Sequence, residues 1–163
     1  MSKRQLKPDI SEDKMGLNPF IDTLEIPVVR RGISNQLKRI DNKLIPAEFD
    51  HELTPHAKLF CDPDKRYLNN SLSLRAKELL LWVMFQTTSS KDYIWINKTM
   101  YMEENNVTSI NTYKEALADL IKKKYLGITL IKDVYWINPK YFFKGDRVKK
   151  YPNNVLTRYN YGQ

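Results

Sequence analysis

The sequence is organised around VTSINTYKEALADLIKKKY, residues 107–125, which joins a helix-start signal to an amphipathic pattern. Thr108 or Ser109 can accept a backbone hydrogen bond and so cap the start of a helix. Apolar residues then recur at helical spacing, which predicts one buried stripe. The members of the stripe are Tyr113, Leu117, Leu120 and Ile121. The first turns off the stripe are polar, as in helices that enter the major groove of DNA.

We predict that this helix binds DNA, with its first residue near a phosphate and the following side chains on base edges. The predicted contacts are Ser109, Asn111, Thr112, Lys114 and Glu115. Two β-rich runs follow, Ile128–Ile131 and Val134–Ile137, joined by a tight turn at Lys132 and Asp133. A helix followed by a two-stranded wing indicates a winged helix, in which Lys132 would contact the DNA backbone beside the groove.

The compact domain is predicted over residues 67–146 and opens with a core helix in NNSLSLRAKELLLWVMFQ, capped by Ser71 or Ser73. YIWI predicts a short strand, and NKTMYMEENN predicts a short helix. Asn105 and Asn106 tolerate a positive φ, which suits the turn into the next helix. The order helix, strand, helix, turn, helix and wing predicts an α+β fold of the winged helix-turn-helix type.

Residues 1–36 are predicted to form an N-terminal arm, with a β segment near 20–29. Apolar residues alternate in NPFIDTLEIPVVRRG, and Pro27 cannot donate to a strand ladder, so we expect an extended segment at a sheet edge. The alternating residues are Phe20, Leu24, Ile26 and Val28. The arm packs either on its own domain or on a partner. Residues 37–66 contain three prolines and are predicted to be an irregular connection.

The 163-residue chain has a formal net charge of +8, most of which lies near the C-terminus. Residues 140–163 hold six basic residues and one acidic residue. We predict that residues 147–163 form a basic, tyrosine-containing tail, because basic groups bind phosphates with release of counterions. The predicted phosphate contacts at this end are Lys144, Arg147, Lys149 and Lys150. The alternative is a tail that only keeps the protein soluble.

The sequence lacks the signatures of an enzyme or a metal site. There is no phosphate-binding loop with Gly-Lys-Ser/Thr and no carboxylate cluster for two-metal chemistry. His51, His56 and Cys61 fall five residues apart, a spacing that does not stack side chains on a helix, and no fourth ligand accompanies them. We therefore expect no catalysis, no cofactor and no metal. The longest apolar run, residues 79–85, is too short to span a membrane.

Four stretches resemble the RepL-type replication initiators of plasmids and phages: SLSLRAKELLLWVM, IWINK, TSINTYKEALADLIKKKYL and VYWINPKYFFKGD. The resemblance is strongest over residues 70–147, and the last stretch is its most specific part. In that family a winged-helix core ends in a strand followed by Asn-Pro, an aromatic pair and Gly-Asp. The matching residues are Asn138, Pro139, Phe142, Phe143, Gly145 and Asp146. Ile110 departs from the pattern, which usually has a polar residue there.

Together, the residues and the resemblance favour a non-enzymatic, sequence-specific protein that binds double-stranded DNA. The resemblance implies that it marks an origin and recruits host replication proteins in the cytoplasm of a bacterial cell. A winged-helix transcriptional regulator uses the same recognition chemistry and is one alternative. Another is a structural adaptor of a phage particle, bound through its arm to phage structural proteins in the virion. A homodimer is open, with the arm packed across a two-fold axis.

Overall fold

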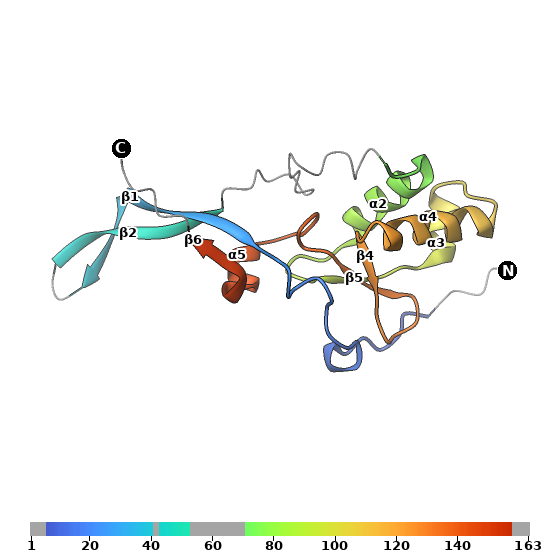
Figure 1. Ribbon diagram of the computed structural model, residues 1–163, viewed down its shortest axis with the longest axis horizontal. Coiled ribbons are helices and arrows are strands. Elements are labelled where there is room, and N and C mark those ends of the chain that lie inside the picture. Colours follow the sequence, from blue (N-terminus) through green and yellow to red (C-terminus); the bar gives the residue numbers. More distant parts are fainter. Residues whose placement is uncertain (1–5, 41–42, 53–70, 158–163) are drawn as a thin grey trace.

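The computed structural model describes residues 6–40, 43–52 and 71–157, which form an elongated α+β molecule (Figure 1). In chain order its elements are η1 (Glu12–Lys14), β1 (Ile26–Ile40), β2 (Lys43–Glu52), α2 (Leu74–Gln86), β3 (Tyr93–Trp95), α3 (Lys98–Glu104), α4 (Ile110–Lys122), β4 (Leu126–Ile128), β5 (Val134–Ile137), α5 (Arg147–Lys150), η3 (Pro152–Asn154) and β6 (Val155–Thr157). Helices α2, α3 and α4 lie toward one end of the molecule, and the β1–β2 hairpin projects at the other.

An antiparallel sheet with the strand order β3-β5-β4 lies beside the helices. Tyr93 pairs with Trp136 and Trp95 pairs with Val134, so these four side chains share one face of the sheet. The other face carries the alternate residues, which join the main hydrophobic core. These are Ile94, Ile96, Tyr135 and Ile137. Both faces of this small sheet therefore carry apolar side chains, and a different part of the chain must pack on each face.

Helices α2, α3 and α4 cover the face that carries Ile94 and Ile137 and form the main core with it. The Ser73 hydroxyl accepts a hydrogen bond from the Ala76 amide at 3.2 Å, which confirms one of the predicted caps of α2. Within the core, Tyr101 joins the helices through ring contacts. Its ring centroid lies 5.5 Å from that of Trp82 and 5.8 Å from that of Tyr113. Each of the three helices thus contributes one ring to this contact.

The segment before β1 covers the opposite face of the same sheet, which carries Val134 and Trp136. Met15 is 1% exposed and forms a second hydrophobic cluster with Val134 and Trp136. Ile10 and Phe20 pack at the margin of this cluster. Part of the predicted N-terminal arm is therefore a structural cover of the β3-β5-β4 sheet.

The rest of the arm belongs to a second sheet with the strand order β2-β1-β6, in which β1 is antiparallel to β2 and parallel to β6. A third hydrophobic cluster lies where β6 pairs with the start of β1. Its buried members are Leu24, Ile26, Val28, Phe143 and Tyr151. The predicted apolar arm thus packs on its own chain, against residues of the C-terminal region. Phe20, which we expected on the same face, lies in the other cluster.

Two predicted boundaries are wrong. The β segment expected near 20–29 begins at Ile26 and runs to Ile40. Residues 37–40 and 43–52 also lie in strands and not in an irregular connection. Pro46 does not prevent this, because it falls beside a register shift, where a strand tolerates proline. The remainder of the predicted connection, including His56 and Cys61, lies outside the described residues. Among the helices that the structure describes, none is both long and apolar enough to cross a membrane.

Candidate nucleic-acid interface

A tight turn between α3 and α4 sets the direction of α4. The Asn97 side chain caps α3 by accepting a hydrogen bond from the Met100 amide at 3.1 Å. After α3, Asn106 adopts a positive φ of 52°, which confirms its predicted role in the turn. The Val107 amide then donates to the Met102 carbonyl at 2.8 Å. Since these contacts are local, the turn that positions α4 is specified by residues close to it in the sequence.

One side of α4 is buried, and the other side is exposed and mainly polar. Tyr113, Ala116 and Leu120 are buried in the main core. The Asp119 carboxylate accepts a hydrogen bond from the Ser73 amide at 2.9 Å, which ties α4 to the start of α2. On the opposite side, exposed residues recur every three or four positions. This exposed face consists of Asn111, Lys114, Glu115, Ala118 and Lys122.

Most of the predicted recognition residues come together at this face. The exposed ones are Ser109, Asn111, Lys114 and Glu115. Thr112 is half-buried, because its place in the helical turn lies at the margin of the exposed face. The sequence reasoning missed Ala118 and Lys122, which lie seven and eleven positions after Asn111. Extending the helical spacing by two more turns would have found both residues.

The connection between β4 and β5 differs from the predicted tight turn. β4 ends at Ile128, and residues 129–133 form a longer loop. The Thr129 hydroxyl closes this loop by donating to the Val134 carbonyl at 2.9 Å and accepting from the Ile131 amide at 3.0 Å. A side chain that bonds to nearby backbone competes with a strand ladder. Strand β4 therefore ends at Ile128 and does not extend to Ile131 as predicted.

The loop between β4 and β5 exposes apolar side chains beside one lysine. Lys132 is exposed in the loop, as its predicted role requires. Its neighbours Ile128 and Leu130 are 70% and 83% exposed. The Leu130 amide donates to the Met15 carbonyl at 3.3 Å, so the N-terminal segment lies against this loop. One lysine beside apolar side chains gives the loop little attraction for a phosphate backbone.

Arg147 does not occupy the phosphate-binding position that the sequence predicted. Its side chain is 2% exposed, and the guanidinium donates to the Pro139 carbonyl at 2.7 Å. Burial lowers the pKa of Arg147 to about 10, although Tyr151 nearby opposes the shift. Arg147 is therefore still charged at neutral pH, but it binds backbone inside the protein. No local pattern predicts this position, because the burial of Arg147 results from packing against distant residues.

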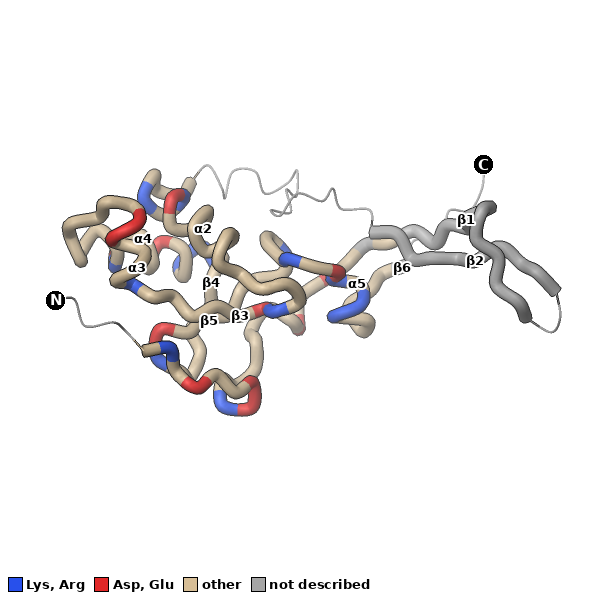
Figure 2. The backbone as a smooth tube through the Cα atoms, turned by 180° about the vertical axis from the view of Figure 1, so that it is seen from behind, with Lys and Arg blue, Asp and Glu red and all other residues tan. Residues whose placement is uncertain are grey.

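The other predicted basic residues of this end differ in their surroundings. The Lys144 ammonium donates to the Thr87 carbonyl at 3.2 Å and is partly engaged. Lys149 and Lys150 are exposed on α5, which Asp146 caps by accepting a hydrogen bond from the Lys149 amide at 3.1 Å. Both figures of the backbone place α5 between the two ends of the molecule, away from α4 (Figures 1 and 2). Of the four predicted phosphate contacts at this end, Lys149 and Lys150 are thus the two that are exposed.

The Asn-Pro part of the C-terminal motif joins the end of β5 to the end of α4. Asn138 is 6% exposed, and its amide group donates to the Lys124 carbonyl at 2.8 Å. Its backbone amide donates to the Tyr125 carbonyl at 3.0 Å. Its side-chain oxygen accepts from the Lys140 amide at 3.0 Å. The asparagine therefore satisfies several backbone groups at once where the chain leaves the sheet.

The aromatic pair and the Gly-Asp of the motif carry the chain toward the second sheet. Phe142 enters the main core, while Phe143 enters the cluster that contains the arm. Gly145 has a φ of +130°, and a Cβ atom there would lie 3.2 Å from the Ser90 backbone nitrogen. A side chain at this position would thus be strained and crowded. The motif is explained by packing and backbone geometry.

Asp92 links three distant parts of the chain. Its carboxylate, in a residue 7% exposed, accepts hydrogen bonds from the Asn18 side chain at 3.1 Å and from the Tyr151 hydroxyl at 3.0 Å. Burial, and then the neighbouring Asp92 charge, raise the pKa of Tyr151 above its ordinary value. Tyr151, which lies in the predicted tyrosine-containing tail, is therefore a buried structural residue. The part of that tail after residue 157 lies outside the described residues.

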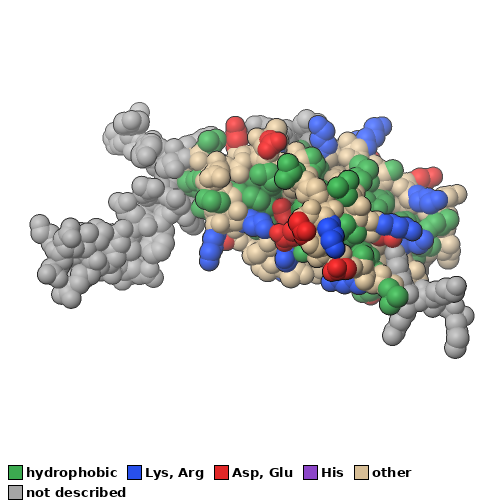
Figure 3. All heavy atoms as spheres, turned by 90° about the horizontal axis from the view of Figure 1, so that it is seen from below, with side chains coloured by type: hydrophobic (Ala, Val, Ile, Leu, Met, Phe, Trp, Pro, Cys, Tyr) green, Lys and Arg blue, Asp and Glu red, His purple; other side chains and the backbone are tan. Residues whose placement is uncertain are grey.

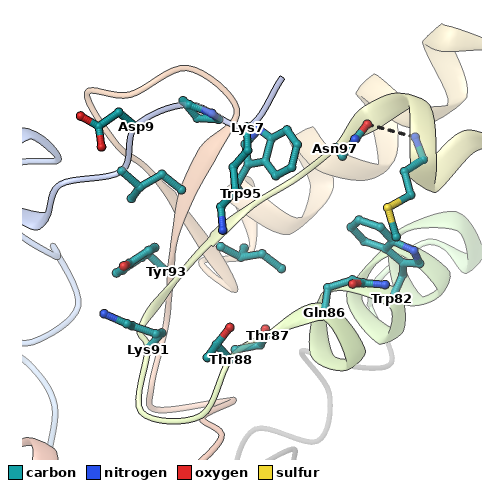
Figure 4. A pocket seen from close by; sticks show the side chains of 14 residues that line it. Lys7, Asp9, Trp82, Gln86, Thr87, Thr88, Lys91, Tyr93, Trp95 and Asn97 are labelled. Atoms are coloured by element: carbon teal, nitrogen blue, oxygen red, sulfur yellow. Dashed lines mark hydrogen bonds between the residues drawn. The ribbon is translucent and has the colours of Figure 1, made fainter. Parts of the chain in front are cut away.

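A cavity of about 480 Å³ lies between residues 7–10, the C-terminal half of α2, β3 and the start of α3 (Figure 4). Trp82 and Trp95 are among its walls. The Lys91 ammonium lies 3.1 Å from the Glu12 carboxylate and 5.3 Å from the centroid of the Tyr93 ring. The hydrogen bond to Glu12 raises the pKa of Lys91. Lys91 at the edge of this cavity is thus engaged by a carboxylate and an aromatic ring.

Charged side chains of both signs are distributed over the described residues. Lys and Arg alternate with Asp and Glu along the helical end and around η1 (Figure 2). The face in Figure 3 shows hydrophobic side chains between charged groups of either sign. A broad basic surface is therefore not visible on that face.

The fold and the exposed face of α4 define an α+β protein with one helix that presents polar side chains to solvent. Ser109 is the N-cap residue of α4, but its side chain makes no capping hydrogen bond there, unlike the predicted cap. Comparison with known proteins adds little to that class. A curated protein from Zymomonas mobilis subsp. mobilis, described as a 20.9 kDa protein, is 26% identical over 151 residues. The match covers 80% of this chain and 82% of the relative. No family model matches the chain, and no solved structure matches it.

Proposed function

We propose that the protein is a non-enzymatic, sequence-specific double-stranded-DNA-binding protein built on a winged helix-turn-helix. The observation that carries this proposal is the polar face of α4, held rigidly by a buried stripe and presented after a tight turn. The order α2, β3, α3, α4, β4 and β5 suits a winged helix. In that architecture the second helix of the helix-turn-helix enters the major groove, which here is α4.

The exposed face suits a base-reading surface. Asn111 lies near the start of the helix, and an asparagine can bind adenine through two hydrogen bonds in the major groove. Ala118 lies in the middle of the face, where a small side chain allows the helix to approach the bases closely. Lys114 and Lys122 supply positive charge beside it, and Glu115 can accept a hydrogen bond from cytosine. The exposed start of α4 at Ser109 suits a backbone phosphate.

The biological role within this class rests on the resemblance to RepL-type initiators. We place the protein in replication of a plasmid or phage, in the cytoplasm of a bacterial host, where it would recruit host replication proteins. A transcriptional regulator is the second candidate, because its contacts with DNA would be the same. An adaptor in a virion has less support. Leu24, Ile26 and Val28 are buried within the chain, so the arm does not need phage structural proteins to cover it.

The test begins with selection of a binding site from a random double-stranded library, followed by affinity measurements on the selected and on random DNA. Asn111→Ala should weaken binding to the selected site by roughly 1–3 kcal/mol and leave binding to random DNA nearly unchanged. Asn153→Ala is the matched control, because Asn153 is an exposed asparagine in η3 and should have no effect on either probe.

Two outcomes would contradict the proposal. If no site is selected, the protein does not read DNA sequence. If Asn111→Ala weakens both probes equally, α4 contacts the backbone and not the bases. Where a site is selected, its genomic position separates the two leading roles, since an initiator binds at an origin and a regulator at a promoter. A two-fold symmetric site would indicate a homodimer.

A further inference from the structure

Ile110 is an apolar residue at the polar start of α4. It is the first residue of the helix and is 37% exposed, and its neighbours Ser109 and Asn111 are also exposed. Helices favour short polar or acidic residues in the first turn, because these satisfy free backbone amides or the helix dipole. An isoleucine does neither, so helix formation does not explain its presence.

Packing covers only part of Ile110. In the helical turn it lies on the same side as Leu117 and Ile121, which pack against the main core, but 37% of it stays exposed. Its position in the helical turn lies at the edge of the exposed face, on the side of Lys114. Exposed apolar surface is unfavourable in water, at about 25 cal/mol per Å². The exposed part of the Ile110 side chain is therefore available to a ligand that also contacts the side chain of Asn111.

We infer that Ile110 packs against the 5-methyl group of a thymine next to the base that Asn111 contacts. This inference rests on the proposed function and adds a specific feature of the DNA site. Thymine is the base that presents a methyl group in the major groove, and apolar side chains recognise it by contact. Ile110 and Asn111 point about 100° apart around the helix, so the two contacts fall on different bases at the same end of α4.

The inference can be tested by removing the methyl group without changing base pairing. Each thymine of the selected site is replaced in turn by deoxyuridine, and the affinity of the full-length protein is measured for each probe. One replacement should weaken binding by about fourfold, the effect expected for one buried methyl group. Ile110→Ala should weaken binding to the thymine probe by at least a similar factor and bind both probes equally. Ile110→Val, which keeps the branched carbon, should retain discrimination.

Ile128→Ala is the matched control, because Ile128 is an exposed isoleucine on β4, outside α4. This variant should still bind the thymine probe more tightly than the deoxyuridine probe. The inference is overturned if deoxyuridine is tolerated at every position, or if Ile110→Ala keeps the preference of the unaltered protein. Either result can occur while Asn111→Ala still weakens binding to the selected site. In that case the proposed function stands, and only the contact between Ile110 and thymine is refuted. If no site is selected at all, both the proposed function and this inference fail.

Discussion

Two buried tyrosines should respond in opposite ways to the loss of a hydroxyl group. Tyr151→Phe removes the donor that lies 3.0 Å from the Asp92 carboxylate, in a pair whose residues are both 7% exposed. The phenyl ring can keep its contact with Phe143, whose ring centroid lies 5.7 Å away. The variant therefore isolates one buried hydrogen bond to a carboxylate. Such a bond contributes about 1.5–3 kcal/mol to the free energy of unfolding.

Tyr113→Phe makes the same chemical change where the hydroxyl gains nothing. The Tyr113 residue is 4% exposed, and its hydroxyl has no hydrogen-bond partner among the described residues. A buried polar group without a partner costs free energy, so its removal should be neutral or should stabilise the protein by up to about 1 kcal/mol. Since Tyr113 lies on the buried side of α4, the exposed face should not change.

Urea unfolding and thermal unfolding, both followed by tryptophan fluorescence at pH 7, would measure the stability change of each variant. We expect Tyr151→Phe to lower the free energy of unfolding and Tm, the latter by about 3–12 °C for a domain of this size. Tyr113→Phe should leave Tm unchanged or raise it. Equal destabilisation by both variants would show that the Asp92 contact adds nothing beyond ring packing, and would refute the role assigned to it.

Two further measurements test the buried tyrosines and the exposed lysines. Burial raises the pKa of four tyrosines above the ordinary value of 10, so they should stay neutral in an absorbance titration of the folded protein near pH 10. They are Tyr101, Tyr113, Tyr135 and Tyr151. Because the unfolded chain loses these protons first, the free energy of unfolding should fall as pH rises above about 10; no fall would contradict their burial. On DNA, replacing Lys149 and Lys150 by alanine should reduce the slope of log affinity against log salt by about 0.9 per phosphate contact, and an unchanged slope would leave α5 without a DNA role.

The helical part of the fold was predictable because its signals are local. Ser73 and Asn97 cap helices within three residues of themselves, and Asn106 makes the turn by its own backbone preference. The apolar stripe of α4 needs no knowledge of the rest of the chain. The same spacing also indicated which side of α4 would be exposed. The elements and residues of the candidate interface therefore came mainly from short-range patterns.

The errors arose where long-range contacts decide the structure. Arg147 was predicted on the surface from its charge, but it binds the carbonyl of Pro139 and is buried. Tyr151 bonds to Asp92 across 59 positions of sequence, a pairing that no local pattern indicates. The end of β4 was misplaced for a smaller reason, since the Thr129 hydroxyl can bond either to solvent or to nearby backbone. Residue type gave the chemistry of each group but not its partner.

The residues that carry the resemblance and the residues that would read DNA can be separated by experiment. Asn138→Ala removes side-chain hydrogen bonds to Lys124 and Lys140 in a residue 6% exposed, and should destabilise the protein by about 1–3 kcal/mol. Asn111→Ala should leave stability nearly unchanged, because Asn111 is exposed and no packing requires it. Measured on both variants, the free energy of unfolding should therefore fall only for Asn138→Ala, and the affinity of the folded protein for the selected site only for Asn111→Ala. If Asn138→Ala kept full stability and lost the selected site, the motif would belong to the DNA interface and not to the closure of the fold.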